Sequence, residues 1–185
     1  SSLVDSLGEG LNTVIDAEGA VGEVDTITTY ITGSIASGLL DGVTRFVIPE
    51  LEKSSFLDVL SHADQTALRS YVESGAGRLI VMGSGKNGNG SGDNGSGSNT
   101  AALINGIFDF EVEVNDCTGD KSKKTGEAAD TIFKDNAANV NSPSKIRCLK
   151  NNSLPPAAVR VYKDGSRSSV TTFYNDNLVH IAYDW

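Results

Sequence analysis

The clearest hydrophobic pattern in the first half of the chain is a strand, a helix and a second strand. Residues 43–49 are a short apolar run that ends at a proline, as a buried strand would. Residues 61–64 (Ser-His-Ala-Asp) form a capping box, which predicts a helix that continues to Gly75. Residues 78–82 form a second apolar run. This spacing is typical of a βαβ unit, so we expect the two strands to be parallel neighbours.

Weaker patterns flank this unit on both sides. Leucine, valine and isoleucine recur at three- and four-residue steps within residues 3–19, which predicts a helix, and the β-branched run 24–31 predicts a strand. Farther along, we expect a helix from about Asn99 to Ile107. The alternation of residues 110–114 predicts a strand after it.

The end of the chain reads as an antiparallel meander. Residues 159–162, 169–173 and 178–182 are rich in β-branched and aromatic side chains, which favours three strands. Asp164-Gly165 is a hairpin signal between the first two, and residues 175–177 turn the chain again.

These elements together predict one α/β domain over residues 1–185, with a mainly parallel sheet flanked by helices and an antiparallel C-terminal hairpin. Residues 84–99 are a low-complexity stretch of glycine, serine and asparagine, which predicts a flexible loop. Because the sequence stops at Trp185, at the end of a predicted strand, we expect this domain to be a fragment of a longer chain.

Composition and charge narrow the possible partners. The formal net charge is −9, and no basic stripe with interleaved aromatics occurs, so nucleic acid is an unfavourable partner. No apolar run of about 18 residues is present to span a bilayer, and the first residues lack a signal-peptide pattern. A secretion signal would therefore lie outside this segment.

The two cysteines, Cys117 and Cys148, flank a polar, loop-rich segment. A disulfide that closed the region 117–148 would stabilise the fold by about 3–4 kcal/mol through loss of entropy in the unfolded chain. The alternative is a pair of free thiols in a reducing compartment. Since neither cysteine lies in a CxxC motif or beside other metal ligands, we favour the disulfide and an oxidising, extracellular location.

Three N-glycosylation sequons agree with that location. They begin at Asn89, Asn94 and Asn151, all in predicted loops where a glycan is tolerated. Such triplets also arise by chance in sequences rich in asparagine and serine.

Two blocks of the chain resemble a known superfamily. Residues 46–49, 67–75 and 79–83 are similar to the flavodoxin-like core of class I glutamine amidotransferase-like domains. Residues 154–159 and 177–185 are similar to the closing hairpin of their secreted members. Catalytic members carry a cysteine in a G-x-C-x-G turn and a C-terminal His-Glu pair. Neither Cys117 nor Cys148 has that setting, so the resemblance implies a fold of the non-catalytic, secreted type.

Few residues qualify for catalysis. The only imidazoles belong to His62, in the capping box and expected to face solvent, and His180, which points to the opposite strand face from its neighbours. We interpret both as structural histidines. No G-x-S-x-G motif occurs, and the segment around Gly85-Lys86 fails the spacing of a phosphate-binding loop.

Candidate metal and ligand sites are weak as well. Asn87, Asn89, Ser91 and Asp93 offer oxygen atoms at alternate positions, but Ser98 stands where calcium needs a bidentate acid, so we predict no metal site and no cofactor. Glu111 and Glu113 share one face of a predicted strand and read as surface charge. Asp184 and Trp185 lie where open α/β sheets bind ligands, although packing of the tryptophan is the simpler interpretation.

Three functional hypotheses follow. The first is a non-catalytic extracellular structural or assembly module, in an appendage or filament, whose partners are other domains or protomers of the assembly. The second is a carbohydrate-binding module that uses exposed aromatics such as Tyr174 or Tyr183. The third is a hydrolase with an acid–histidine pair that the sequence does not reveal.

Overall fold

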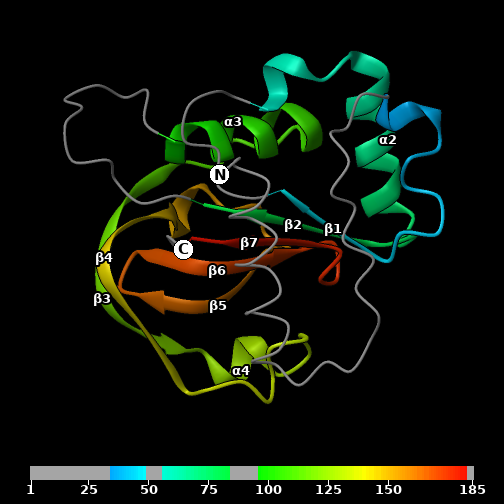
Figure 1. Ribbon diagram of the computed structural model, residues 1–185. Coiled ribbons are helices and arrows are strands. Elements are labelled where there is room, and N and C mark those ends of the chain that lie inside the picture. Colours follow the sequence, from blue (N-terminus) through cyan, green and yellow to red (C-terminus); the bar gives the residue numbers. More distant parts are fainter. Residues whose placement is uncertain (1–33, 49–55, 84–95, 183–185) are drawn as a thin grey trace, which may run out of the picture. The chain divides into compact units, whose positions relative to one another are not determined.

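The computed structural model of the protein describes residues 34–48, 56–83 and 96–182, and the elements below lie in the compact unit of residues 35–184 (Figure 1). Within these residues the helices are η1 (Ile35–Ser37), η2 (Phe56–Val59), α2 (His62–Glu73), α3 (Ser96–Phe108), α4 (Thr125–Ala128) and η3 (Asn151–Ser153). The strands are β1 (Arg45–Ile48), β2 (Arg78–Met82), β3 (Val114–Lys123), β4 (Asn139–Lys150), β5 (Val159–Asp164), β6 (Arg167–Phe173) and β7 (Leu178–Ile181).

One mixed sheet contains all seven described strands, in the order β1-β2-β7-β6-β4-β3-β5. The pairs β1–β2 and β2–β7 are parallel, and we call these three strands the parallel part. All other pairs are antiparallel. Because β5 pairs with β6 as well as with β3, the strands β3, β4, β6 and β5 close into a loop of pairings, which we call the ring.

This topology overturns the expected fold class. The sheet is mostly antiparallel and the described part of the chain is mostly β, so the protein is not a flavodoxin-like parallel sheet flanked by helices. The expected βαβ unit is present, since β1 and β2 are parallel neighbours on either side of α2 in the sequence. It extends by one parallel strand only, because β7 belongs to the predicted C-terminal meander.

The secondary structure predicted from the sequence differs most from the structure between the two cysteines. Residues 117–148 were expected to be rich in loops, but most of them belong to the long strands β3 and β4. In β3 the buried positions are occupied by Cys117 and Lys121, while the residues between them are exposed or half-buried. A lysine at a buried strand position removes the alternation of apolar and polar residues by which strands are recognised. The strand predicted over residues 110–114 is wrong too, because β3 begins only at Val114.

The helix α2 forms for the reason that the sequence indicates. The Ser61 hydroxyl accepts a hydrogen bond from the Asp64 amide at 3.2 Å, and the Asp64 carboxylate accepts one from the Ser61 amide at 3.1 Å. This capping box satisfies amide groups that the first helical turn leaves free. Gly75, with φ of 73°, follows the helix in the left-handed conformation.

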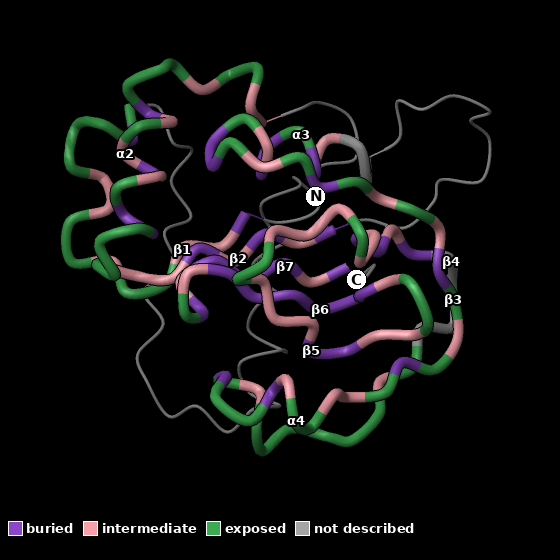
Figure 2. Tube along the Cα trace, turned by 180° about the vertical axis from the view of Figure 1, so that it is seen from behind, coloured by how far each residue is buried: buried purple, intermediate pink, exposed green. Residues whose placement is uncertain are grey.

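The main core lies between the sheet and the pair α2 and α3. Both helices pack on the same face, through Leu68 and Val72 of α2 and through Leu103 and Ile104 of α3. In Figure 2 the tube is buried along most of β6 and β7 and exposed on the outer sides of α2 and α4. A second, smaller cluster packs Ala128 of α4 against ring residues Val161, Tyr162 and Val170.

Several other predicted elements are present in the structure. The helix expected from Asn99 begins at Ser96, and the three C-terminal strands and both turns are present. The helix predicted over 3–19, the strand over 24–31 and most of the loop 84–99 lie outside the described residues. No described helix is long and apolar enough to cross a membrane.

Candidate functional site

A groove of about 480 Å³ lies where the chain leaves α3 and where it leaves β4. We call it the acidic groove. Its lining combines carboxylates, an amide, a hydroxyl and apolar groups, contributed by Asp109, Phe110, Glu111, Glu113, Asn152, Ser153, Leu154 and Pro155. The Glu113 amide donates to the Ser153 hydroxyl at 2.8 Å, which holds the two sides of the groove together. The site is thus formed by two segments far apart in the sequence.

An aromatic cluster adjoins the acidic groove through Phe110, which belongs to the groove lining. The Phe110 ring stacks on Phe173 at 5.4 Å and on Tyr174 at 5.8 Å between centroids. The Tyr174 hydroxyl donates to the Glu73 carboxylate at 3.3 Å and remains at the surface. Burial, followed by the negative charge of Glu73, raises the pKa of Tyr174. Tyr174, which the sequence offered as an exposed aromatic, is therefore half-buried, and its phenol is neutral at physiological pH.

The backbone beside the aromatic cluster adopts an unusual conformation. Asp109 has φ of 54°, and the turn between β6 and β7 has φ of 50° at Tyr174, 53° at Asn175 and 69° at Asp176. Residues other than glycine rarely occupy this left-handed region, although Asn and Asp tolerate it. Strain of this kind persists only where surrounding contacts hold it. Here the aromatic stack holds Tyr174, and the Asp176 carboxylate accepts a hydrogen bond from the Ile132 amide at 2.7 Å.

The charges around the groove are partly paired. The Arg69 guanidinium contacts Glu73 at 3.0 Å and Asp109 at 2.5 Å, and the Lys150 ammonium pairs with Glu113. Glu111 is exposed and makes no ion pair or hydrogen bond within the described residues. The expectation that Glu111 and Glu113 share a strand face is wrong, because both precede β3. The groove therefore presents hydrogen-bond acceptors beside an aromatic cluster.

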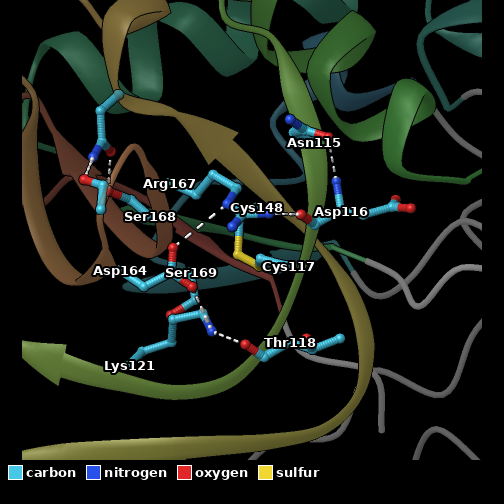
Figure 3. Close-up of polar contacts among 12 residues, drawn as sticks. Asn115, Asp116, Cys117, Thr118, Lys121, Cys148, Asp164, Arg167, Ser168 and Ser169 are labelled. Carbon is cyan, nitrogen blue, oxygen red and sulfur yellow. Dashed lines mark hydrogen bonds and ion pairs between the residues drawn. A yellow bond between two sulfur atoms is a disulfide. The ribbon is translucent and has the colours of Figure 1, made fainter.

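The ring contains a second group of polar contacts. Cys117 and Cys148 are joined by a disulfide with a Cα–Cα distance of 5.9 Å, so the predicted pairing is present. Beside it the fully buried Lys121 ammonium lies 2.9 Å from the Asp164 carboxylate and donates to the Thr118 and Gly119 carbonyl oxygens (Figure 3).

Arg167 lies next to this ion pair. Its guanidinium is 3.4 Å from the Asp164 carboxylate and also donates to the Asp116 carbonyl oxygen (Figure 3). Buried charges are stable only when they are paired and hydrogen-bonded, and Lys121 meets both conditions. We therefore regard the charges beside the disulfide as structural. No sequence pattern indicated this contact, because its members lie on β3, β5 and β6.

The two histidines have opposite environments. His62 is exposed on the first turn of α2, as expected. His180 is fully buried on the helix-covered face, opposite to the side on which Val179 and Ile181 lie, and neither ring nitrogen has a hydrogen-bond partner. Burial lowers the pKa of the His180 imidazole to about 4, so the ring is neutral at pH 7.

The remaining predicted site residues are placed as follows. The Asn151 side chain donates to the Gly165 carbonyl oxygen at 3.1 Å and accepts from the Ser168 hydroxyl at 2.5 Å, so this sequon asparagine has a structural role. Glycosylation of Asn151 remains a prediction. Asn89, Asn94, the candidate calcium ligands at 87–93, Tyr183, Asp184 and Trp185 lie outside the described residues, and nothing is described of the Ser98 side chain. Within the described residues, no three metal-ligating side chains converge.

Comparison with known proteins finds no matching family model, no matching curated protein and no matching solved structure.

Proposed function

We propose that this chain is a non-catalytic extracellular module with a structural or assembly role in a larger protein. The observation that carries the proposal is the disulfide between Cys117 and Cys148, which is almost completely buried and links neighbouring strands of the ring. Disulfides form and persist in oxidising compartments, and they are typical of secreted and extracellular proteins. Other domains or protomers of the same assembly are the expected partners.

The test begins with the chain expressed with a secretion signal. Its intact mass is measured before and after reduction and deglycosylation. We expect the secreted protein to carry the disulfide, and the same spectra report glycans on Asn89, Asn94 and Asn151. Free thiols in the secreted protein would contradict the proposal.

Stability provides the second readout. The double variant Cys117→Ser/Cys148→Ser should lose about 3–4 kcal/mol of unfolding free energy, because the open chain regains its entropy. A reductant should lower the thermal midpoint of the natural sequence and leave that of the double variant unchanged. Equal stability of the natural sequence and the double variant would overturn the structural role. Catalytic turnover by the purified module would overturn the non-catalytic role.

A second candidate function is carbohydrate binding at the acidic groove. The specific observation in its favour is Phe110, which lines the groove next to carboxylate, amide and hydroxyl groups and stacks on the neighbouring Tyr174. Sugars present apolar ring faces to aromatic side chains and hydroxyl groups to acceptors, so this combination suits a neutral glycan.

Binding is measured on a glycan array and then by calorimetry with the oligosaccharides that bind. Tyr174→Ala and Glu111→Gln should each weaken binding by roughly tenfold, the loss of about 1.4 kcal/mol. Asp130→Asn is the matched control, because this exposed carboxylate lies outside the groove lining. Absence of binding across the array would reject the glycan function and leave the structural proposal untouched.

A further inference from the structure

The boundary between the parallel part and the ring contains an unusual pair of buried side chains. His180 on β7 and Thr171 on β6 are Cα partners in the antiparallel ladder, so their side chains lie on the same face, with Cβ atoms about 4.5–5.5 Å apart. Both residues have an exposure of 0%. The two ring nitrogens of His180 and the Thr171 hydroxyl have no hydrogen-bond partner, although the two residues are neighbours.

Leaving these atoms unpaired would be costly. An unsatisfied buried donor or acceptor destabilises a fold by about 1–3 kcal/mol, and more than nine in ten such groups in proteins are satisfied. A neutral imidazole has one donor and one acceptor, and a threonine hydroxyl can act as both. His180 and Thr171 therefore present hydrogen-bond donors and acceptors to the same small region.

The residues around His180 and Thr171 limit which kind of molecule can hydrogen-bond to the imidazole and the hydroxyl. Val81 of β2 and Ser169 of β6 lie on the same sheet face and are uncharged. Arg160 of β5, the other Cα partner of Thr171, is paired with the Glu127 carboxylate at 2.7 Å. Thr100 of α3 lies above the end of β2, where its hydroxyl is 3.5 Å from the Met82 carbonyl oxygen, and it is also buried. Because the charge of Arg160 is already neutralised by Glu127, a neutral molecule that donates and accepts hydrogen bonds fits this environment.

Gly83, the residue after β2, limits the size of such a molecule. A Cβ atom at Gly83 would lie 3.3 Å from His180 Nε2 and 3.1 Å from the Ala182 Cα, so the backbone already approaches the imidazole closely. The space beside the ring is therefore tight.

We propose that His180 and Thr171 bind an internal water molecule that bridges the imidazole and the hydroxyl across the β6–β7 pair. The water accepts a hydrogen bond from one group and donates one to the other. It joins β7 of the parallel part to β6 of the ring. The proposal is independent of the extracellular function.

The direct test is a crystal structure of the chain at a resolution that shows ordered water. We expect density within hydrogen-bond distance, about 2.7–3.2 Å, of both the Thr171 hydroxyl and a His180 nitrogen. Imidazole ¹⁵N shifts of the same protein in solution should show that nitrogen to be hydrogen-bonded. A dry contact, an anomalous metal peak, or a thermal midpoint raised by Zn²⁺ would overturn the assignment.

The direction in which Thr171→Val changes stability gives an independent test. If water bridges the pair, Thr171→Val removes a hydrogen bond and should raise the unfolding equilibrium constant by roughly five- to tenfold. If the hydroxyl has no partner, valine of the same shape should leave that constant unchanged or lower it, which would reject the proposal. Thr131→Val is the matched control, because the buried Thr131 hydroxyl donates to the Ala128 carbonyl oxygen at 2.8 Å. This variant loses a known hydrogen bond and should be less stable.

A double-mutant cycle shows whether the two side chains act through one shared molecule. With water present, the effects of Thr171→Val and His180→Leu should be non-additive, because either change removes the bridge. Additive effects would contradict a shared ligand.

Discussion

In the parallel part, β1, β2 and β7 are held under α2 and α3 by apolar side chains such as Leu79 and Val81. In the ring, β3, β4, β5 and β6 are held by a disulfide and a buried ion pair as well as by a smaller apolar cluster. The difference follows from geometry. Both α2 and α3 pack on one face of the parallel part. The ring shares this core through Leu149 of β4 and Phe173 of β6, and its own smaller cluster packs against the single turn of α4.

The two regions should therefore respond differently to the same kind of perturbation. Loss of an apolar side chain should matter most in the parallel part, and loss of a cross-link or charge should matter most in the ring. His180 lies at their boundary, where β7 is parallel to β2 and antiparallel to β6.

The largest effect is expected from Leu79→Ala in the parallel part. Leu79 is fully buried between the sheet and the helices, so its truncation leaves a cavity and should cost about 4 kcal/mol of unfolding free energy. Urea denaturation measures this value. Val59→Ala is the control, because Val59 is 72% exposed and should lose little. A loss below about 1 kcal/mol at Leu79 would show that this core is not what stabilises the parallel part.

The second effect is acid destabilisation through His180. Its pKa is about 4 in the folded protein and about 6.5 when unfolded, so the unfolded state binds the proton more tightly. The stabilising contribution is complete above pH 6.5 and decreases as the pH falls toward 4. The full loss is about 3 kcal/mol.

Urea denaturation between pH 4 and pH 7 measures this dependence. The difference between the natural sequence and His180→Leu isolates the histidine from the titration of carboxylates. Substitution of the exposed His62 by glutamine should leave the pH profile unchanged. A difference that is flat with pH would contradict the burial of a neutral imidazole.

An intermediate effect is expected in the ring from Lys121→Met. Methionine fills a similar volume but leaves the Thr118 and Gly119 carbonyl oxygens without their donor, which should cost about 2 kcal/mol. Asp164 keeps the Arg167 guanidinium as a counter-charge. Lys134→Met is an exposed control, and if both variants lose the same stability, the buried ion pair has no special role.

The smallest effect belongs to the capping box. Ser61→Ala should cost about 1 kcal/mol, because the Asp64 amide loses its acceptor. Thermal denaturation is sensitive enough to detect this change. Ser70→Ala, at an exposed position within α2, is the control and should be neutral or slightly stabilising because alanine is a good helix former.

Local signals along the sequence determined the βαβ unit and the C-terminal meander. The capping box at Ser61 and the apolar run 78–82 specify their elements through interactions between near neighbours, and Asp164-Gly165 specifies its turn in the same way. The cysteine pairing was also predictable, since only two cysteines are present.

Only the tertiary structure decided the sheet topology and the sites. Lys121 occupies a buried strand position because Asp164, 43 residues later, neutralises it, and no local pattern contains that information. The acidic groove joins residues 109–113 to 152–155, and the His180–Thr171 pair exists only because β6 and β7 align in one register. Periodicity reports which side of an element is buried, whereas long-range pairing decides what each buried polar group meets.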